Sequence, residues 1–122
     1  MIIKLTYKTR KPLHEQIADC IRTAIYDDTL KDGDKLPSIR ELTRKLPVSD
    51  ITVKRAYYTL KSEGLVHSIS GRGTFVYLRE NWRELRESSL LAELSVIAEE
   101  LCKLGTTKEK LLDCIQKVYE KE

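Results

Sequence analysis

The stretch from Leu36 to Gly64 constrains the fold more than any other part of the chain, because it carries start and stop signals for two successive helices. Ser38 followed three residues later by Glu41 is a capping box, in which each side chain bonds a free backbone N–H at a helix start. Pro47 disfavours helical geometry in the residue before it. The sequence therefore predicts a short helix that begins at Ser38 and ends before Pro47. Its apolar face holds Ile39, Leu42 and Leu46.

A second helix follows, from Asp50 to about Glu63. Ser49 is suited to cap its start, and Gly64 is suited to end it in the left-handed conformation. At 100° per residue, one stripe is apolar and is expected in the core with Phe75; it holds Val53, Ala56, Tyr57 and Leu60. The opposite face pairs two cations with two large side chains, which is unusual for a surface that meets only water. This outer face holds Ile51, Lys54, Arg55 and Tyr58.

Two short helices joined by a tight turn, the second with a cationic outer face, are typical of a helix-turn-helix whose second helix enters the DNA major groove. The other interpretation is an ordinary helical hairpin with a solvated polar face. The following segment favours the first. Residues 65–69 and 74–78 are rich in branched and aromatic side chains and flank a Ser-Gly-Arg-Gly turn, which predicts a β-hairpin. Such a hairpin is a wing, and Arg72 at its tip is placed for phosphate or the adjacent groove, or is a solvated turn residue.

The segments before this stretch complete the predicted domain. Apolar residues at helical spacing predict a helix from about Pro12 to Tyr26 that packs on the other two. Residues 2–7 alternate loosely and are compatible with an arm or an edge strand. Leu36, between a turn and Pro37, suits a very short extended segment that could pair with a later strand.

The C-terminal part predicts two amphipathic helices. The first runs from Trp82 to Leu104 and ends at Gly105; Thr106 with Glu109 forms another capping box for the second. The surrounding chain is too short to cover both apolar stripes, so we expect a homodimer through this tail. The alternative is that the tail folds back on its own winged domain. The candidate dimerisation residues are Leu90, Leu94, Ile97, Leu101, Leu104, Leu111, Ile115 and Val118.

Length and charge fit one small domain with an appendage. Within the 122 residues, residues 1–78 hold 14 Lys and Arg against 9 Asp and Glu, whereas residues 79–122 hold 8 against 10. A basic module followed by an acidic segment suits a polyanion-binding unit with a tail that has another job. The sequence has no apolar run of membrane-spanning length and no leader pattern, so we expect a cytoplasmic protein without a membrane segment.

Chemistry-bearing residues are sparse. The three cysteines form no C-x-x-C pair and the two histidines are far apart, so we expect no metal site and no cofactor, with thiols buried in a reducing cytosol. The sequence has no nucleophile and base pattern and no phosphate-cradling glycine loop before a helix. We therefore expect no enzymatic activity.

The run from PLHEQI through LPSIREL and VSDITVKRAYYTLKSEGL to SGRGTFV resembles the winged-helix domain of the GntR family of bacterial transcription regulators. The short helical tail resembles the YtrA-type branch. The resemblance implies a dimeric repressor-like protein on an inverted-repeat operator, with Arg40 contacting DNA, residues 49–55 reading the major groove and residues 71–73 reaching the minor groove. Asp50 and Pro47 depart from many relatives, and Asp50 is either a helix starter or a reader of cytosine.

The prediction is thus an α+β, mainly helical protein: a winged helix-turn-helix DNA-binding domain over residues 1–78 and a two-helix dimerisation hairpin over 79–122. Its partners are double-stranded DNA and a second copy, and an unidentified small-molecule effector is left open. The alternative function is a winged-helix protein-interaction module with only nonspecific DNA affinity. The candidate DNA-binding residues are Arg40, Arg44, Ser49, Asp50, Ile51, Thr52, Lys54, Arg55, Gly71, Arg72 and Gly73.

Overall fold

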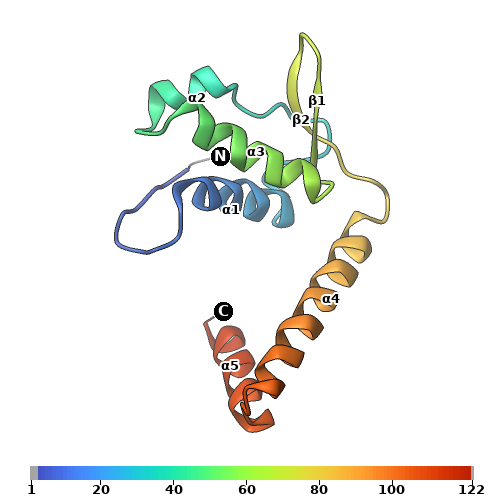
Figure 1. Ribbon diagram of the computed structural model, residues 1–122. Helices are drawn as coiled ribbons and strands as arrows, with labels where there is room; N and C mark the ends of the chain where they lie inside the picture. The colour runs from blue at the N-terminus through green and yellow to red at the C-terminus, as the bar shows by residue number, and fades with distance from the viewer. Residues whose placement is uncertain (1–2, 122) are drawn as a thin grey trace. The chain divides into compact units, whose positions relative to one another are not determined.

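The computed structural model describes residues 3–121, and the chain forms two compact units, residues 1–82 and 83–122. The fold is α+β and mainly helical, as predicted (Figure 1). The first unit holds three helices and a two-stranded sheet, and the second holds most of α4 and all of α5. The elements are α1 (Leu13–Tyr26), α2 (Ile39–Lys45), α3 (Asp50–Ser62), β1 (Val66–Ile69), β2 (Gly73–Val76), α4 (Trp82–Lys103) and α5 (Lys108–Glu120).

The predicted start and stop residues define α2 and α3. Ser38 Oγ accepts from the Glu41 N–H at 3.0 Å, and Glu41 Oε1 accepts from the Ser38 N–H at 3.1 Å, so the capping box is complete. Ser49 Oγ accepts from the Thr52 N–H at 3.2 Å and caps α3. Gly64, at φ +78°, follows the end of α3 in the left-handed region that glycine adopts without strain. The helix-turn-helix prediction is confirmed.

The core of the first unit is organised around α3, which contacts α1, α2 and β1 (Figure 1). Apolar residues on the inner stripe of α3 pack against the matching stripe of α1 and against the wing strands. Burial of such side chains is the main stabilising contribution in a domain of this size. The largest of the fully buried side chains are Ile17, Ile21, Ile25, Leu36, Val53, Leu60, Leu65 and Val76.

The N-terminal segment is an arm and not a strand, since residues 3–12 form no sheet pairing. Its anchor is the side chain of Gln16, which is 8% exposed. The Gln16 amide accepts from the Thr6 N–H and donates to the carbonyl oxygens of Thr6 and Lys11, each at 2.9 Å. These bonds satisfy a buried amide, which would otherwise be costly to desolvate. Residues 1 and 2 lie outside the described residues.

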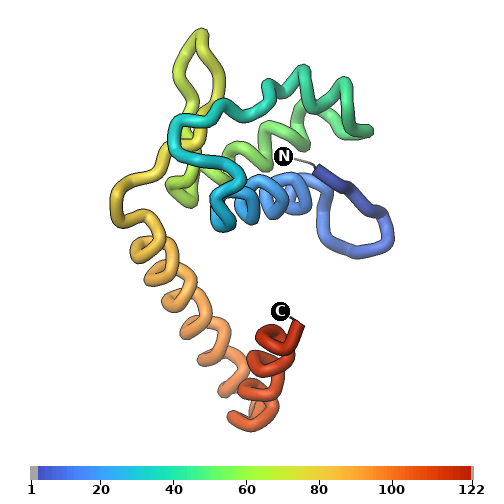
Figure 2. Tube along the Cα trace, turned by 180° about the vertical axis from the view of Figure 1, so that it is seen from behind, coloured from blue at the N-terminus to red at the C-terminus, as the bar shows by residue number. Residues whose placement is uncertain are grey.

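The wing is an antiparallel hairpin in which Val66 pairs with Val76 and Ile69 with Gly73. A third segment is bonded to its outer strand: the Leu36 N–H donates to Thr74 O at 2.8 Å, and the Val76 N–H donates to Asp34 O at 2.8 Å. The expectation of an extended segment at Leu36 is therefore confirmed. Seen from behind in Figure 2, this segment runs beside the foot of the hairpin.

Phe75 is not in the core, which corrects the prediction. It is only partly buried, whereas its neighbour Val76 is 1% exposed. Alternate side chains of a strand point to opposite faces, so only one of the two neighbours can point inward. The pairing of Val66 with Val76 places the smaller residue inside and leaves Phe75 opposite His67 on the outer face.

The second unit is a helical hairpin, in which α5 runs back from the loop at Gly105 (Figures 1 and 2). The cap of α5 is Thr107, whose Oγ1 accepts from the Lys110 N–H at 3.2 Å, and not Thr106 as predicted. The reason is the end of α4, where the Thr106 N–H donates to Leu101 O at 3.0 Å and Gly105 has φ +89°. Thr106 belongs to this closing turn, which moves the next cap on by one residue.

No side chain within residues 83–121 is buried. The expectation of buried thiols is consequently wrong for Cys102 and Cys114, which are exposed, while Cys20 in the first unit is partly buried. Side chains of this unit are not buried because a hairpin of only two helices has no core that could enclose the apolar stripes of α4 and α5. Among residues 3–121, no helix has both the length and the apolar character that crossing a membrane requires.

Candidate nucleic-acid interface

The outer face of α3 is exposed while its inner face is fully buried. Ile51 is 70% exposed and Tyr58 is 72% exposed, and Lys54 and Arg55 between them are also exposed. Isolated apolar residues on a surface are ordinary, but here two large ones flank two cations on a single helix face. This composition can contact both the phosphates and the apolar base edges of a duplex.

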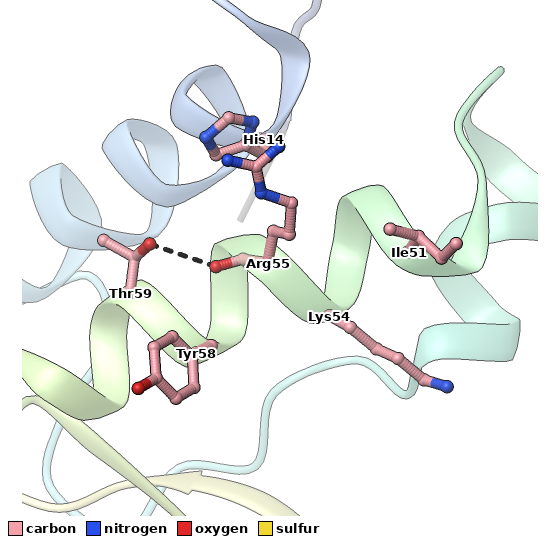
Figure 3. Close-up of a pocket in the computed structure, with 6 residues that line it drawn as sticks. All are labelled: His14, Ile51, Lys54, Arg55, Tyr58 and Thr59. Atoms are coloured by element: carbon pink, nitrogen blue, oxygen red, sulfur yellow. Dashed lines mark hydrogen bonds between the residues drawn. The ribbon is translucent and has the colours of Figure 1, made fainter.

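A shallow pocket of about 460 Å³ lies along this face and reaches α1. Figure 3 shows Arg55 extending towards His14 on α1, whereas Lys54 and Tyr58 lie on the other side of α3. Thr59 lines the same pocket, and its hydroxyl donates to Arg55 O at 3.0 Å. His14 joins this pocket from α1 through the packing of the helices, so no local sequence pattern could have indicated it, whereas Thr59 lies one turn after Arg55 on the same helix.

The start of α3 is held by hydroxyl groups. Ser49 Oγ and Thr52 Oγ1 lie 3.0 Å apart and share a hydrogen bond in addition to the cap. Asp50 is exposed in the first turn, where its charge is favourable at the positive end of the helix dipole. The segment from Ser49 to Arg55 therefore presents a rigid and largely exposed first two turns.

A buried phenol on α3 bonds the segment directly before α2, and α2 also packs on α3 through Leu42. Tyr57 is 5% exposed, and its hydroxyl donates to Pro37 O at 2.6 Å, directly before the capping residue Ser38. Burial raises the pKa of Tyr57, so the phenol remains a donor at neutral pH. Arg40 and Arg44 project from α2 and are exposed.

The wing tip owes its shape to glycine. Gly71 has φ +76° and Gly73 has φ +120°, conformations that other residues adopt only with strain. The Arg72 N–H donates to Ile69 O at 2.9 Å, which closes the turn and leaves the Arg72 side chain exposed. The predicted hairpin with an exposed cation at its tip is confirmed.

The cations divide into paired and unpaired groups. Arg22 on α1 donates to both carboxylate oxygens of Glu63 at 2.8 Å and also pairs with Asp19, and Lys11 pairs with Asp19 as well. By contrast, within residues 3–121 no carboxylate lies within 4.0 Å of six exposed cations. Unpaired cations are the groups that can release counterions on contact with a polyanion. The six are Lys35, Arg40, Arg44, Lys54, Arg55 and Arg72.

The predicted DNA-binding residues thus fall on α2, α3 and the wing of one compact unit, and all are exposed except Thr52, which is partly buried. Among residues 3–121 there is no group of three or more His, Cys, Asp or Glu side chains suited to a metal ion.

Three helices followed by a wing form a winged helix-turn-helix. The exposed outer face of α3 and the unpaired cations define a protein of the DNA-binding regulator class. The chain belongs to the GntR family: the model of "Bacterial regulatory proteins, gntR family" matches residues 13–76. The short two-helix tail and the relatives below place it in the YtrA-type branch.

Two YtrA relatives cover most of the chain. It is 31% identical over 124 residues to the HTH-type transcriptional repressor YtrA of Bacillus subtilis, with 96% of this chain and 92% of that one covered. The structure of YtrA from Sulfolobus acidocaldarius, a GntR-family transcription factor, aligns with TM-score 0.60 and 39% identity over 78% of this chain and 99% of that one.

A third comparison concerns the winged domain alone. The DNA-binding domain of AraR, solved in complex with its operator ORR3, aligns with TM-score 0.53 and 32% identity over 60% of this chain and 88% of that chain. The three comparisons agree with the family that the sequence patterns indicated.

Proposed function

We propose that the protein is a sequence-specific, homodimeric repressor that binds an inverted-repeat operator. The observation that carries this proposal is the outer face of α3, where Ile51 and Tyr58 are about 70% exposed on either side of two unpaired cations. Within the described residues 3–121 these four side chains are exposed, and they have the chemistry of a major-groove reader.

Each element has a proposed role. Lys54 and Arg55 contact phosphate or guanine, Ile51 contacts a thymine methyl group, and Thr52 contacts a base edge or phosphate. Arg40 and Arg44 hold phosphates, which position the domain without reading sequence. Arg72, between Gly71 and Gly73, contacts the adjacent minor groove, where narrow A·T-rich segments attract arginine, or a phosphate at its edge.

Dimerisation is assigned to the tail, residues 79–122, and DNA binding to residues 1–78. Along α4 and α5 the exposed apolar side chains include Leu90 (41%), Leu94 (42%), Ile97 (56%), Leu104 (75%) and Val118 (60%). Leu101, Leu111 and Ile115 are partly buried. Exposed apolar side chains in such number are typical of an interface, and a second copy offers the same side chains by twofold symmetry. Two recognition helices related in this way match an inverted repeat.

The family and the named repressor among the relatives support this assignment. In the GntR relatives cited above, one is described as a transcriptional repressor and one was solved on its operator. A role as a protein-interaction module would leave only salt-sensitive, sequence-independent DNA affinity.

The test is selection of bound duplexes from a random pool with the full chain. We expect an inverted repeat with half-sites separated by about one helical turn, or about 10 base pairs. Recovery of unselected sequences, with binding lost at moderate salt, would contradict the proposal. The same selection with Asp50→Asn separates the two roles of Asp50, because a changed base at one position identifies a reader and an unchanged site identifies a helix starter.

A further inference from the structure

A second pocket, of about 360 Å³, lies beside the turn of the wing. It is formed by the segment that precedes α2 together with the turn and the adjoining ends of both wing strands. The sequence patterns indicated Arg72 in this turn, but they did not indicate Lys35. The polar lining of the pocket consists of Lys35, Ser38, Ser68, Ser70, Arg72 and Thr74.

The backbone of Lys35 is fixed against the wing. Lys35 forms an antiparallel bridge with Phe75, and the next residue, Leu36, donates its N–H to Thr74 O at 2.8 Å. The Gly33 N–H donates to Val76 O, and the Val76 N–H donates to Asp34 O, each at 2.8 Å. The root of the Lys35 side chain therefore moves with the wing strands and not with an independent loop.

The side chain of Lys35 lies over the bare backbone of Gly73. A Cβ atom at Gly73 would be 2.9 Å from Lys35 Cε and 3.7 Å from Lys35 Nζ. The close approach of the stem is thus possible because residue 73 has no side chain, and it places the ammonium beside the turn that carries Arg72. Two cations from different segments meet the same pocket.

No carboxylate within residues 3–121 pairs with the Lys35 ammonium. The nearby Glu41 accepts the backbone N–H of Ser38, so its carboxylate is held by the helix cap. The pocket also contains the hydroxyls of Ser68 and Thr74, which share a hydrogen bond at 3.0 Å, so that one of the two can still donate to a further acceptor. An unpaired ammonium, an arginine and hydroxyl donors are the groups that hold a phosphate.

We propose that Lys35 and Arg72 hold one phosphate of the operator backbone in this pocket. This inference rests on the proposed DNA-binding function and adds a phosphate contact between the turn of the wing and the segment before α2. Both cations are exposed, so a free anion in water gains little from them. A duplex, in contrast, gains from counterion release at each neutralised phosphate. The phosphodiester of DNA is therefore the occupant that the charge pattern favours.

The proposed phosphate contact does not depend on the base sequence of the duplex. It acts by positioning the wing on the DNA backbone. Because Lys35 is bonded to the wing strands, a phosphate held there fixes the angle at which the tip approaches the duplex. Loss of the charge should weaken binding to every duplex by a similar factor and leave the base preference unchanged.

The experiment compares Lys35→Met with wild type by fluorescence anisotropy on the selected operator and on scrambled duplex, over a series of salt concentrations. Methionine keeps an unbranched stem over Gly73 and removes the charge. We expect roughly 3- to 30-fold weaker binding of both duplexes and a slope of log affinity against log salt that is smaller by about 0.9. Lys35→Arg should restore the slope. Lys31→Met, which removes an exposed charge from the preceding turn, is the matched control and should leave the slope unchanged.

Three outcomes overturn the inference. An unchanged slope in Lys35→Met, with native circular dichroism and with wild type still preferring its operator, removes the phosphate contact and leaves the proposed function intact. Inorganic phosphate that competes with DNA more strongly than chloride at equal ionic strength would assign the pocket to a free anion. Wild type without preference between operator and scrambled duplex would remove the proposed function, and this inference with it.

Discussion

The hydroxyl of Tyr57 on α3 donates a 2.6 Å hydrogen bond to the carbonyl oxygen of Pro37, immediately before α2. This hydrogen bond links α3 to the segment that leads into α2. Tyr57 also fills the core with Val53 and Leu60. Because the ring of Tyr57 packs in the core and its hydroxyl bonds Pro37, the position of α2 and the stability of the domain depend on the same side chain.

We expect Tyr57→Phe to lower the free energy of unfolding by about 1–2 kcal/mol, because the Pro37 carbonyl loses its partner while the aromatic ring is retained. Operator affinity should fall by more than the unfolded fraction explains, since the start of α2 is no longer fixed to α3. Urea denaturation and anisotropy titration measure the two quantities. Tyr58→Phe, which removes an exposed hydroxyl, is the control for stability. Equal stability of Tyr57→Phe and wild type would refute the coupling.

The same phenol predicts a dependence on alkaline pH. Burial, with a smaller effect of the Glu41 charge, raises the pKa of Tyr57 above its ordinary value of 10.0. The folded state holds the proton more tightly than the unfolded chain, so this contribution to stability is complete below the unfolded pKa and is lost as pH rises towards the folded pKa. The free energy of unfolding should therefore decrease more steeply above about pH 10 in wild type than in Tyr57→Phe. Parallel pH profiles for the two proteins would show that the residue does not titrate differently on folding.

Local patterns predicted the helices of the first unit because each boundary depends on residues close in sequence. Ser38 with Glu41, Pro47 and Gly64 act on backbone groups within one turn, and the structure confirms each of them. The errors arose where a neighbouring element decided the outcome. Thr106 is used by the closing turn of α4, and Thr107 caps α5 instead.

Features that depend on tertiary contact were beyond the sequence. The inward position of Val76 and the outward position of Phe75 follow from strand register, where a shift of one residue exchanges the faces. The approach of Lys35 to Gly73 likewise depends on a bridge between residues nearly forty positions apart. The candidate DNA-binding residues on α2, α3 and the wing were identified because all three surfaces come from contiguous motifs.

Arg22 and Glu63 form a two-point ion pair that joins α1 to the end of α3, with side chains 19% and 15% exposed. We expect Arg22→Met to lower the free energy of unfolding by about 1–3 kcal/mol, because it leaves a half-buried carboxylate without its main donor. The double substitution with Glu63→Gln should cost less than the sum of the single ones. Urea denaturation measures all three. Lys117→Met, which removes an exposed pair with Asp113, is the control and should cost less than about 0.5 kcal/mol. Additive single effects would mean that the pair contributes no coupling.

Arg40→Ala and Arg72→Ala should each weaken operator binding by about 1–3 kcal/mol without unfolding the domain. Both side chains are exposed and lack a carboxylate partner within residues 3–121, so their removal leaves no unpaired charge behind. Anisotropy on the selected operator gives the affinity, and thermal denaturation by circular dichroism verifies the fold. Lys31→Ala is a control of the same charge change in the turn between α1 and α2. Unchanged affinity in both arginine variants would count decisively against the interface described above.

The tail gives the last prediction. Leu94 and Ile97 are 42% and 56% exposed on one face of α4, and no side chain of residues 83–121 is buried. A charge placed on a surface that a second copy covers would have to be desolvated without a partner, which is costly. We therefore expect Leu94→Glu with Ile97→Glu to be monomeric by sedimentation at a micromolar concentration at which we expect wild type to be a dimer. The variant should bind a single half-site as wild type does and lose its advantage on the full inverted repeat, because the second recognition helix is no longer linked to the first. Glu93→Gln, on the polar side of the same turn, should remain dimeric. A dimeric double variant would place the contact between copies elsewhere in the chain.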